Sequence, residues 1–201
     1  QLSFIDPWFI EKINNIVQIE TKLKSLPLEQ KILANAKKFG FSDKQIGRAV
    51  NKEELEIRKI RKEFGILPVV KQIDTLAAEW PAKTNYLYLT YGGTSNDLSL
   101  GVEEQGIVVI GAGPYRIGSS VEFDWGTVNM VWGLQDNGEK NVVVVNCNPE
   151  TVSTDYDICK RLYFEELTFE RILDITEFES PKGVVTSVGG QTANNLTTKL
   201  S

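Results

Sequence analysis

The stretch GIVVIGAGPYRIGSSVEFDW, residues 106–125, decides the fold. Its apolar start is typical of a buried strand, two glycines one residue apart make a turn, and we expect a helix over residues 118–137. The same order recurs downstream, with strands expected within 141–149, 160–167 and 183–190, a helix over 169–178 capped by Thr168, and a last helix from about Thr192. Strands that alternate with helices predict an open, mainly parallel sheet with helices on both faces, a Rossmann-like α/β domain.

The first third of the chain contains residues that typically cap the ends of short helices. Asp6 precedes Pro7 as an N-cap, and Gly40 and Gly65 stand where left-handed C-terminal caps fall. Ser42 and Asn51 each precede Gln or Glu by three residues, which predicts helices over 43–50 and 52–64. We therefore expect a small helical module over residues 1–67.

Residues 68–105 read as a connecting segment. Two prolines interrupt it, the aromatic alternation of NYLYLTY (85–91) predicts one strand, and its last part has the composition of a loop. The α/β domain then occupies residues 106–201. Charge supports a division of the chain, because residues 1–65 carry 13 Lys and Arg against 9 Asp and Glu, whereas the rest carries 9 against 18.

The composition excludes several kinds of site. The chain has no histidine, and Cys147 and Cys159 stand twelve residues apart, so neither a zinc set nor a Cys–His nucleophile pair is expected. No apolar run approaches the roughly 18 to 20 residues that span a bilayer, so we expect no membrane association. The start Gln1-Leu2-Ser3 lacks an initiator Met and a secretion signal, which favours a fragment of a longer chain.

The glycine turn invites a dinucleotide interpretation that the spacing opposes. A dinucleotide fingerprint requires a third glycine where this chain has Arg116, and an acidic residue about 20 positions further on. Here no acid follows the second strand until Glu150. Two interpretations remain open: a turn whose backbone N–H groups face an anion, and a purely structural turn.

Residues 41–65 invite a second interpretation, a helix-turn-helix. A recognition helix is rich in side chains that read bases and bind phosphates, whereas residues 52–64 mix five basic with four acidic side chains. This mixture favours a solvated or subunit-contact helix and no nucleic-acid partner. A stand-alone nucleic-acid or protein-binding module stays as the alternative function.

Polar and acidic residues gather after each predicted strand of the α/β domain. They are Glu122 and Asp124 after the first strand, Glu150 and residues 151–155 after the second, and residues 187–195 after the last. Because the carboxyl ends of parallel strands share one edge, we expect these segments to converge there on a small ligand. For Asp124 and Asp155, capping of a helix or turn is an equal alternative.

Several stretches together resemble the large chain of carbamoyl-phosphate synthetase. GPYRIGSSVEFDW, NCNPETVSTDYD, RLYFEELTFERILDI and SVGGQT follow the family's order, and IDPWF, GFSDKQI and KQIDTLAAE precede them. The resemblance runs from about Ile5 to the end of the chain. It implies the later part of the oligomerisation domain, followed by the pre-ATP-grasp domain of the carbamate-phosphorylating half, in a eukaryotic type of sequence.

The resemblance also implies roles for particular residues. Glu122 and Glu150, with Arg116 and Ser120 beside them, are expected to face the internal passage that carries carbamate. Active-site edge loops are expected at Gly111, Gly113, Asn148, Thr151, Gly189, Gly190 and Gln191. No catalytic residue and no metal ligand is expected within the fragment, because the family's ATP-grasp lobes follow it.

For the whole protein, the resemblance implies an ATP-dependent ligase. Such an enzyme makes carbamoyl phosphate from bicarbonate, ammonia released from glutamine and two ATP, with Mg²⁺ and, as a further candidate, K⁺. It implies a glutamine amidotransferase partner, self-association through the helical module, and a cytoplasmic or mitochondrial location. The fragment alone is expected to be inactive.

Overall fold

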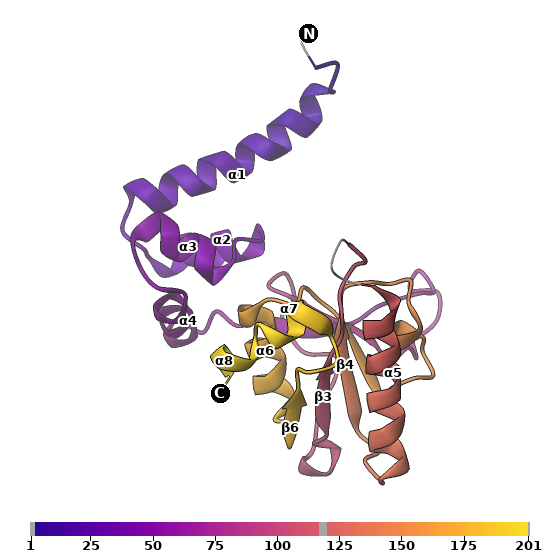
Figure 1. Cartoon of the computed structure of the whole chain (residues 1–201). Coiled ribbons are helices and arrows are strands. Elements are labelled where there is room, and N and C mark those ends of the chain that lie inside the picture. The colour runs from indigo at the N-terminus through magenta and orange to yellow at the C-terminus, as the bar shows by residue number, and fades with distance from the viewer. Residues whose placement is uncertain (1–2, 117–119, 201) are drawn as a thin grey trace. The chain divides into compact units, whose positions relative to one another are not determined.

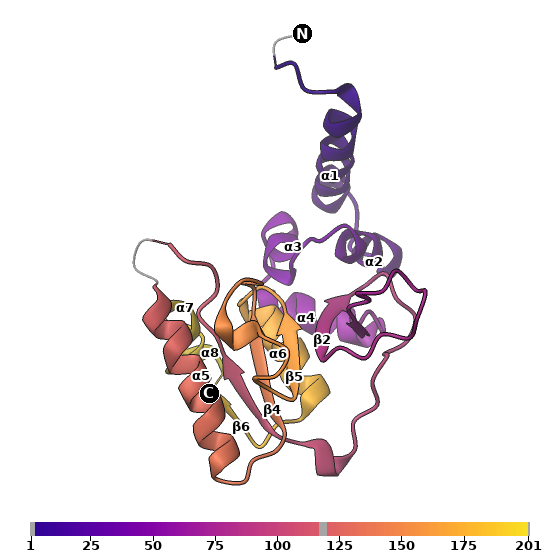
Figure 2. The same ribbon diagram turned by 90° about the vertical axis from the view of Figure 1, so that its right-hand side faces the viewer.

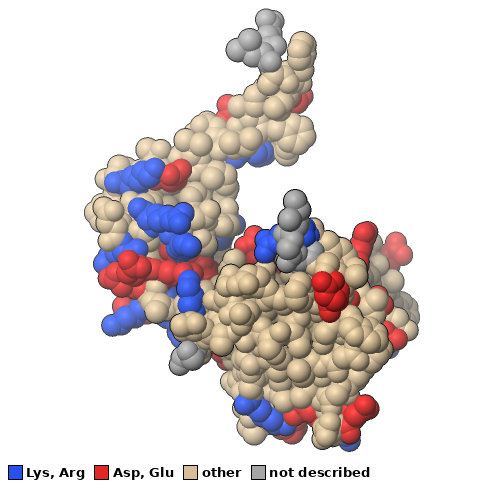
Figure 3. Space-filling view, in the orientation of Figure 1, with Lys and Arg blue, Asp and Glu red and all other residues tan. Residues whose placement is uncertain are grey.

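The computed structural model of the chain describes residues 3–116 and 120–200. The chain forms two compact units, a helical one of Gln1–Pro68 with Thr90–Gly92, and an α/β one of Val69–Leu89 with Gly93–Ser201 (Figure 1). Lys and Arg side chains gather on the visible face of the helical unit, while much of the visible α/β surface carries no charge (Figure 3). In the described part of the chain, no helix has the length and apolar character needed to cross a membrane.

The helical unit contains α1 (Pro7–Ser25), α2 (Gln30–Lys38), α3 (Asp43–Val50) and α4 (Glu54–Glu63). The predicted caps are confirmed: Asp6 accepts a hydrogen bond from the Trp8 N–H, and Ser42 forms a reciprocal capping box with Gln45. Its core is a cluster of buried side chains, namely Ile19, Leu23, Leu33, Ala36, Phe41, Ile46 and Ile57. Only the C-terminal part of α1 contributes to it.

One predicted cap is wrong. Asn51 does not begin a helix; it ends α3 in the left-handed conformation, with φ of +55°, and its N–H donates to the Gly47 carbonyl. Glu53 is the residue that precedes α4, and its N–H donates to the side chain of Glu56. Asparagine tolerates the left-handed conformation better than most residues, so the same letter serves at either end of a helix.

A cluster of buried charges lies inside the helical unit. The Asp43 carboxylate accepts hydrogen bonds from Lys37 Nζ at 2.9 Å and from Arg61 Nε at 2.7 Å, and all three side chains are excluded from water. Both cations also lie over the ring of Tyr91, in the short segment that follows β2 (Tyr86–Thr90). Asp43 therefore neutralises two buried cations at once.

The α/β unit is built on a six-stranded sheet in the order β1-β2-β5-β4-β3-β6. The strands are β1 (Val69–Gln72), β2 (Tyr86–Thr90), β3 (Ile107–Ile110), β4 (Val142–Asn146), β5 (Arg161–Phe164) and β6 (Gly183–Val185). The pairs β2–β5, β5–β4, β4–β3 and β3–β6 are parallel, with Val109 opposite both Val144 and Val185. The predicted parallel α/β sheet is confirmed.

Helices cover both faces of this sheet (Figure 2). On one face α5 (Val121–Asp136) packs Val128 and Val131 against Val109 and Val144. On the other face α6 (Phe169–Glu179) packs Ile172 and Ile175 against the sheet, beside α7 (Gly190–Asn194) and α8 (Thr197–Leu200). Short 3-10 turns, η1 (Val102–Glu104) and η2 (Val152–Thr154), complete the unit.

Three details differ from the expectation. Residues 68–105 do more than connect, since β1 and β2 join the sheet, and β1 carries only four residues after Pro68. The last helical segment begins at Gly190 instead of Thr192 and is interrupted before α8. The first positions of the helix expected over 118–137 lie outside the described residues, and α5 begins at Val121.

Replacing Asp43 by Asn should destabilise the helical unit strongly. Lys37 and Arg61 would each lose their buried ion pair with the Asp43 carboxylate, and removing one partner of a buried pair typically costs about 3–5 kcal/mol. Urea unfolding followed by amide exchange in α2–α4 measures it. Glu20→Gln is the control, because its pair with Lys24 is exposed and is worth at most about 1 kcal/mol. Equal losses in both variants would contradict the argument.

Candidate functional site

The carboxyl edge of the sheet is held together by the side chain of Asn146, the last residue of β4. Its Oδ1 accepts hydrogen bonds from the N–H groups of Gly113 (3.0 Å) and Asn148 (3.2 Å). Its Nδ2 donates to Ser153 Oγ at 3.2 Å, and the residue is fully buried. One amide thus fixes the turn after β3 and the loop after β4 in relation to each other.

The crevice between β3 and β6 is closed by backbone contact. The strand order reverses at β3, which is where open α/β sheets usually bind ligands. A Cβ on Gly189 would lie 2.3 Å from the Gly111 carbonyl oxygen and 2.5 Å from that of Ile110. Gly113 adopts φ of +75°, which its turn requires. The predicted glycine loops therefore meet, but they leave little room for a dinucleotide between them.

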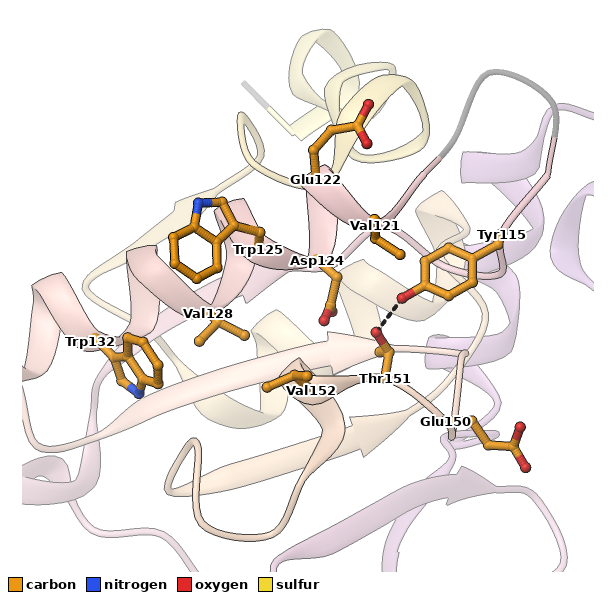
Figure 4. A pocket seen from close by; sticks show the side chains of 10 residues that line it. All are labelled: Tyr115, Val121, Glu122, Asp124, Trp125, Val128, Trp132, Glu150, Thr151 and Val152. Carbon is orange, nitrogen blue, oxygen red and sulfur yellow. Dashed lines mark hydrogen bonds between the residues drawn. The ribbon is translucent and has the colours of Figure 1, made fainter.

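A cavity near this edge lies elsewhere, between α5 and the loop that contains η2 (Figure 4). It has a volume of about 630 Å³. Its lining is mostly apolar and aromatic and includes three carboxylates. The lining residues are Tyr115, Val121, Glu122, Asp124, Trp125, Val128, Trp132, Glu150, Thr151 and Val152. We call this cavity the α5 groove. Its size is in the range of small-ligand sites.

The three carboxylates of the α5 groove point in different directions (Figure 4). Asp124 is buried and turns toward η2, where its Oδ2 accepts a hydrogen bond from the Ser153 N–H at 3.2 Å. Glu122 and Glu150 are exposed, and their side chains stand on different elements and point away from each other, so they do not form a close pair. Of the two interpretations of Asp124, the contact with η2 supports the structural one.

Glu122 is held in its ionised form. The Ser120 hydroxyl and the backbone N–H of Glu122 itself donate to the carboxylate and lower its pKa below the ordinary value. Ser120 directly precedes α5, so the start of the helix adds to the same effect. The exposed mouth of the groove therefore carries a negative charge at neutral pH.

The other predicted residues are spread along the edge. Arg116 donates to Thr192 Oγ1 of α7 at 2.6 Å and is not among the residues that line the α5 groove. Thr151 shares a 2.6 Å hydrogen bond with the Tyr115 hydroxyl, while Asn148 Oδ1 accepts from the Glu150 N–H at 3.0 Å. Gly190 and Gln191 begin α7, where the Gln191 amide donates to Asn195.

Two residues that build this region, Asn146 and Trp132, have no predicted role in the site. Ser153 is predicted there only as one of residues 151–155, and Trp125 only as part of the quoted GPYRIGSSVEFDW stretch. The seven-residue spacing of the two tryptophans places them on one side of α5. That spacing was the available signal.

Metal and thiol chemistry have no visible basis in the described residues. Across residues 3–116 and 120–200, no group of three or more Cys, Asp or Glu side chains is arranged to hold a metal ion. Burial raises the pKa of the Cys159 thiol to about 12 and also raises that of Cys147. Neither thiol is activated as a nucleophile.

Comparison with known proteins assigns a class to both units. Residues 1–65 match the family described as carbamoyl-phosphate synthetase large chain, oligomerisation domain, and residues 103–201 match the carbamoyl phosphate synthase preATP-grasp domain. The fold and the matches together define an oligomerisation domain followed by a pre-ATP-grasp domain. The chain belongs to the carbamoyl-phosphate synthetase large-chain family.

Relatives match over the whole chain. Multifunctional protein CAD of Squalus acanthias is 52% identical, as are the mitochondrial arginine-specific carbamoyl phosphate synthase large chain of Neurospora crassa and the mitochondrial carbamoyl-phosphate synthase [ammonia] of Rattus norvegicus. Each match covers 100% of this chain but only 9%, 17% and 13% of the respective relative. The chain thus spans a small part of the proteins it resembles.

The alternative of a stand-alone helix-turn-helix module finds no support. Residues 41–65 lie within the match to the oligomerisation domain, and two of the basic side chains of α4, Arg58 and Arg61, are buried. Lys52 pairs with Glu56 at 3.4 Å on the exposed side. These side chains are not arranged to reach phosphates or bases.

Replacing Gly189 by Ala should destabilise the α/β unit by about 1–3 kcal/mol, because the added methyl group would collide with two backbone carbonyls. Gly133→Ala is the matched control. Gly133 lies in α5, an added Cβ there meets no atom within 4 Å, and alanine should stabilise the helix by about 0.5–1 kcal/mol. Chemical denaturation measures both; stabilisation by both alanines would refute the close approach.

Proposed function

We propose that the chain is part of an ATP-dependent ligase that makes carbamoyl phosphate from bicarbonate, ammonia released from glutamine, and two ATP. The support is the order of the two family matches, oligomerisation then pre-ATP-grasp, together with identity of about half the residues to the relatives named above. In this proposal residues 1–67 belong to the oligomerisation domain, and residues 106–201 belong to the pre-ATP-grasp domain of the carbamate-phosphorylating half. Residues 68–105 join the two and add β1 and β2 to the sheet.

The chain itself is proposed to position groups without performing the phosphoryl transfer. ATP, Mg²⁺ and, as a further candidate, K⁺ would bind to the ATP-grasp lobes of the full-length enzyme. The loops after β3, β4 and β6 would border that active site. We therefore expect the 201-residue chain on its own to be inactive.

Glu122 and Glu150 are proposed to face the passage that carries carbamate. The lowered pKa of Glu122 keeps this carboxylate ionised, so it repels the carbamate anion. It can, however, accept hydrogen bonds from the N–H groups of carbamate or from the O–H of carbamic acid. A carboxylate at this point therefore favours passage of the protonated, neutral form and slows the anion.

Glu122→Ala in the full-length enzyme should reduce carbamoyl-phosphate formation by about tenfold, the equivalent of one lost hydrogen bond to the travelling intermediate. Bicarbonate-dependent ATP hydrolysis, which precedes that transfer, should fall much less. Measuring both rates side by side tests the role. Asp136→Asn, an exposed acid at the other end of α5, is the control and should leave both rates unchanged. A proportional loss of both rates in Glu122→Ala would contradict the proposed role of Glu122 in carbamate transfer.

The partner proposed for the full-length enzyme is a glutamine amidotransferase subunit or domain, which supplies ammonia. The compartment is the cytosol or the mitochondrion; two of the relatives named above are described as mitochondrial.

The helical unit is proposed to mediate self-association. Its support is the exposed apolar side of α1, which includes Phe9, Ile13 and Val17 at helical spacing.

Ile13→Lys should weaken this self-association, because it places a charge in the middle of the apolar side of α1. Gln18→Lys adds the same charge on the opposite side of the helix and should have no effect. Sedimentation over a range of protein concentrations measures the association. If both variants associate like the unmodified protein, another surface is responsible.

A further inference from the structure

The α5 groove has an unusually exposed aromatic wall. Trp125 and Trp132 are 66% and 44% exposed, and Val121 and Val152 beside them are also exposed. The two tryptophans stand seven residues apart on one helix, a rise of about 10.5 Å. Large apolar side chains gathered on one strip of surface are typical of places where another protein surface packs.

A second observation at the floor of the groove points to a ligand group. Asp124 is only 4% exposed; its Oδ2 accepts from the Ser153 N–H, while its Oδ1 has no hydrogen-bond partner. A buried carboxylate oxygen without a donor is costly and rare in folded proteins. Asp124 is one of the residues that line the groove, so this unpartnered oxygen is buried at the floor of the groove.

The charges of the groove select the kind of donor. Glu122, Asp124 and Glu150 line it, and none of the described lining residues is Lys or Arg. The groove is therefore negative around an apolar wall. A basic side chain flanked by apolar ones matches both properties, since it neutralises Asp124 and covers the indoles.

We propose that the α5 groove is a docking surface for a polypeptide segment that carries one arginine or lysine among apolar side chains. The basic group reaches Asp124 Oδ1, and the apolar neighbours cover Trp125 and Trp132. The segment comes from the part of the full-length polypeptide outside these 201 residues, which is large, because the chain makes up 9–17% of the relatives described above. A single small cation cannot cover both Trp125 and Trp132, because the two indoles stand one helical heptad apart. This length favours a polypeptide segment as the occupant. The inference does not depend on the carbamate passage.

Hydroxyl-radical footprinting with mass spectrometry tests whether the groove is covered. Oxidation of Trp125 and Trp132 is compared between the 201-residue chain and the full-length protein. Both tryptophans should be protected severalfold in the full-length protein. Trp80, which is 68% exposed and lies outside the groove, is the internal control within the same unit. Equal oxidation of Trp125 in both proteins would overturn the proposal.

Two further measurements distinguish the proposed segment from other occupants of the groove. If protection of Trp125 appears in the 201-residue chain as its concentration rises, a second copy covers the groove and the proposed occupant is wrong. If ethylammonium or guanidinium ions alone protect Trp125 in that chain while the full-length protein shows no protection, the groove is a small-cation site. Either result replaces the proposal with a different one.

The role of the charge is tested in the full-length protein with Asp124→Asn. Asparagine keeps an acceptor for Ser153 but loses the negative charge, so Trp125 oxidation should rise toward its value in the isolated chain. Slow exchange of the Ser153 amide verifies that η2 stays in place. Val152→Lys, at an exposed position of the groove, provides a second variant and should also raise oxidation, because it repels an incoming cation. If Trp125 stays equally protected from oxidation in both variants, the occupant of the groove does not bind through a basic side chain.

Discussion

The carboxyl edge of the sheet depends on the hydrogen bonds made by the side-chain amide of Asn146. Through Gly113 it sets the turn that leads into α5, and through Ser153 it sets η2. Ser153 in turn donates its N–H to Asp124 of α5. Three segments far apart in the sequence are thereby joined by one chain of buried hydrogen bonds, and the groove between α5 and η2 owes its shape to this network.

Much of this architecture could be predicted from the sequence, because it follows from local chemistry. Short stretches rich in apolar residues predicted β3, β4, β5 and β6, and Asp6, Ser42 and Thr168 marked three helix starts correctly. Asn51 was misplaced because its side chain suits both ends of a helix. The strand β1 was missed because four residues with mixed polarity give no clear alternation, and its position depends on pairing with the rest of the sheet.

The candidate site could be predicted only as far as its location. Parallel strands guarantee that Glu122, Asp124 and Glu150 come to one edge, but side-chain direction is decided by neighbours that pattern analysis does not see. Asp124 turns inward because a backbone N–H of η2 meets it, whereas Glu122 turns outward beside Ser120. Likewise Arg116 reaches α7 through Thr192, a contact between residues 76 positions apart.

The contact of Gly189 with Gly111 has a mechanical consequence. Where side chains separate two segments, rotamer changes can absorb small displacements; here backbone rests directly on backbone. The start of α7 therefore lies directly against the end of β3 and the turn after it. Neither segment can take up a larger residue or a new position at this point unless the other one moves with it.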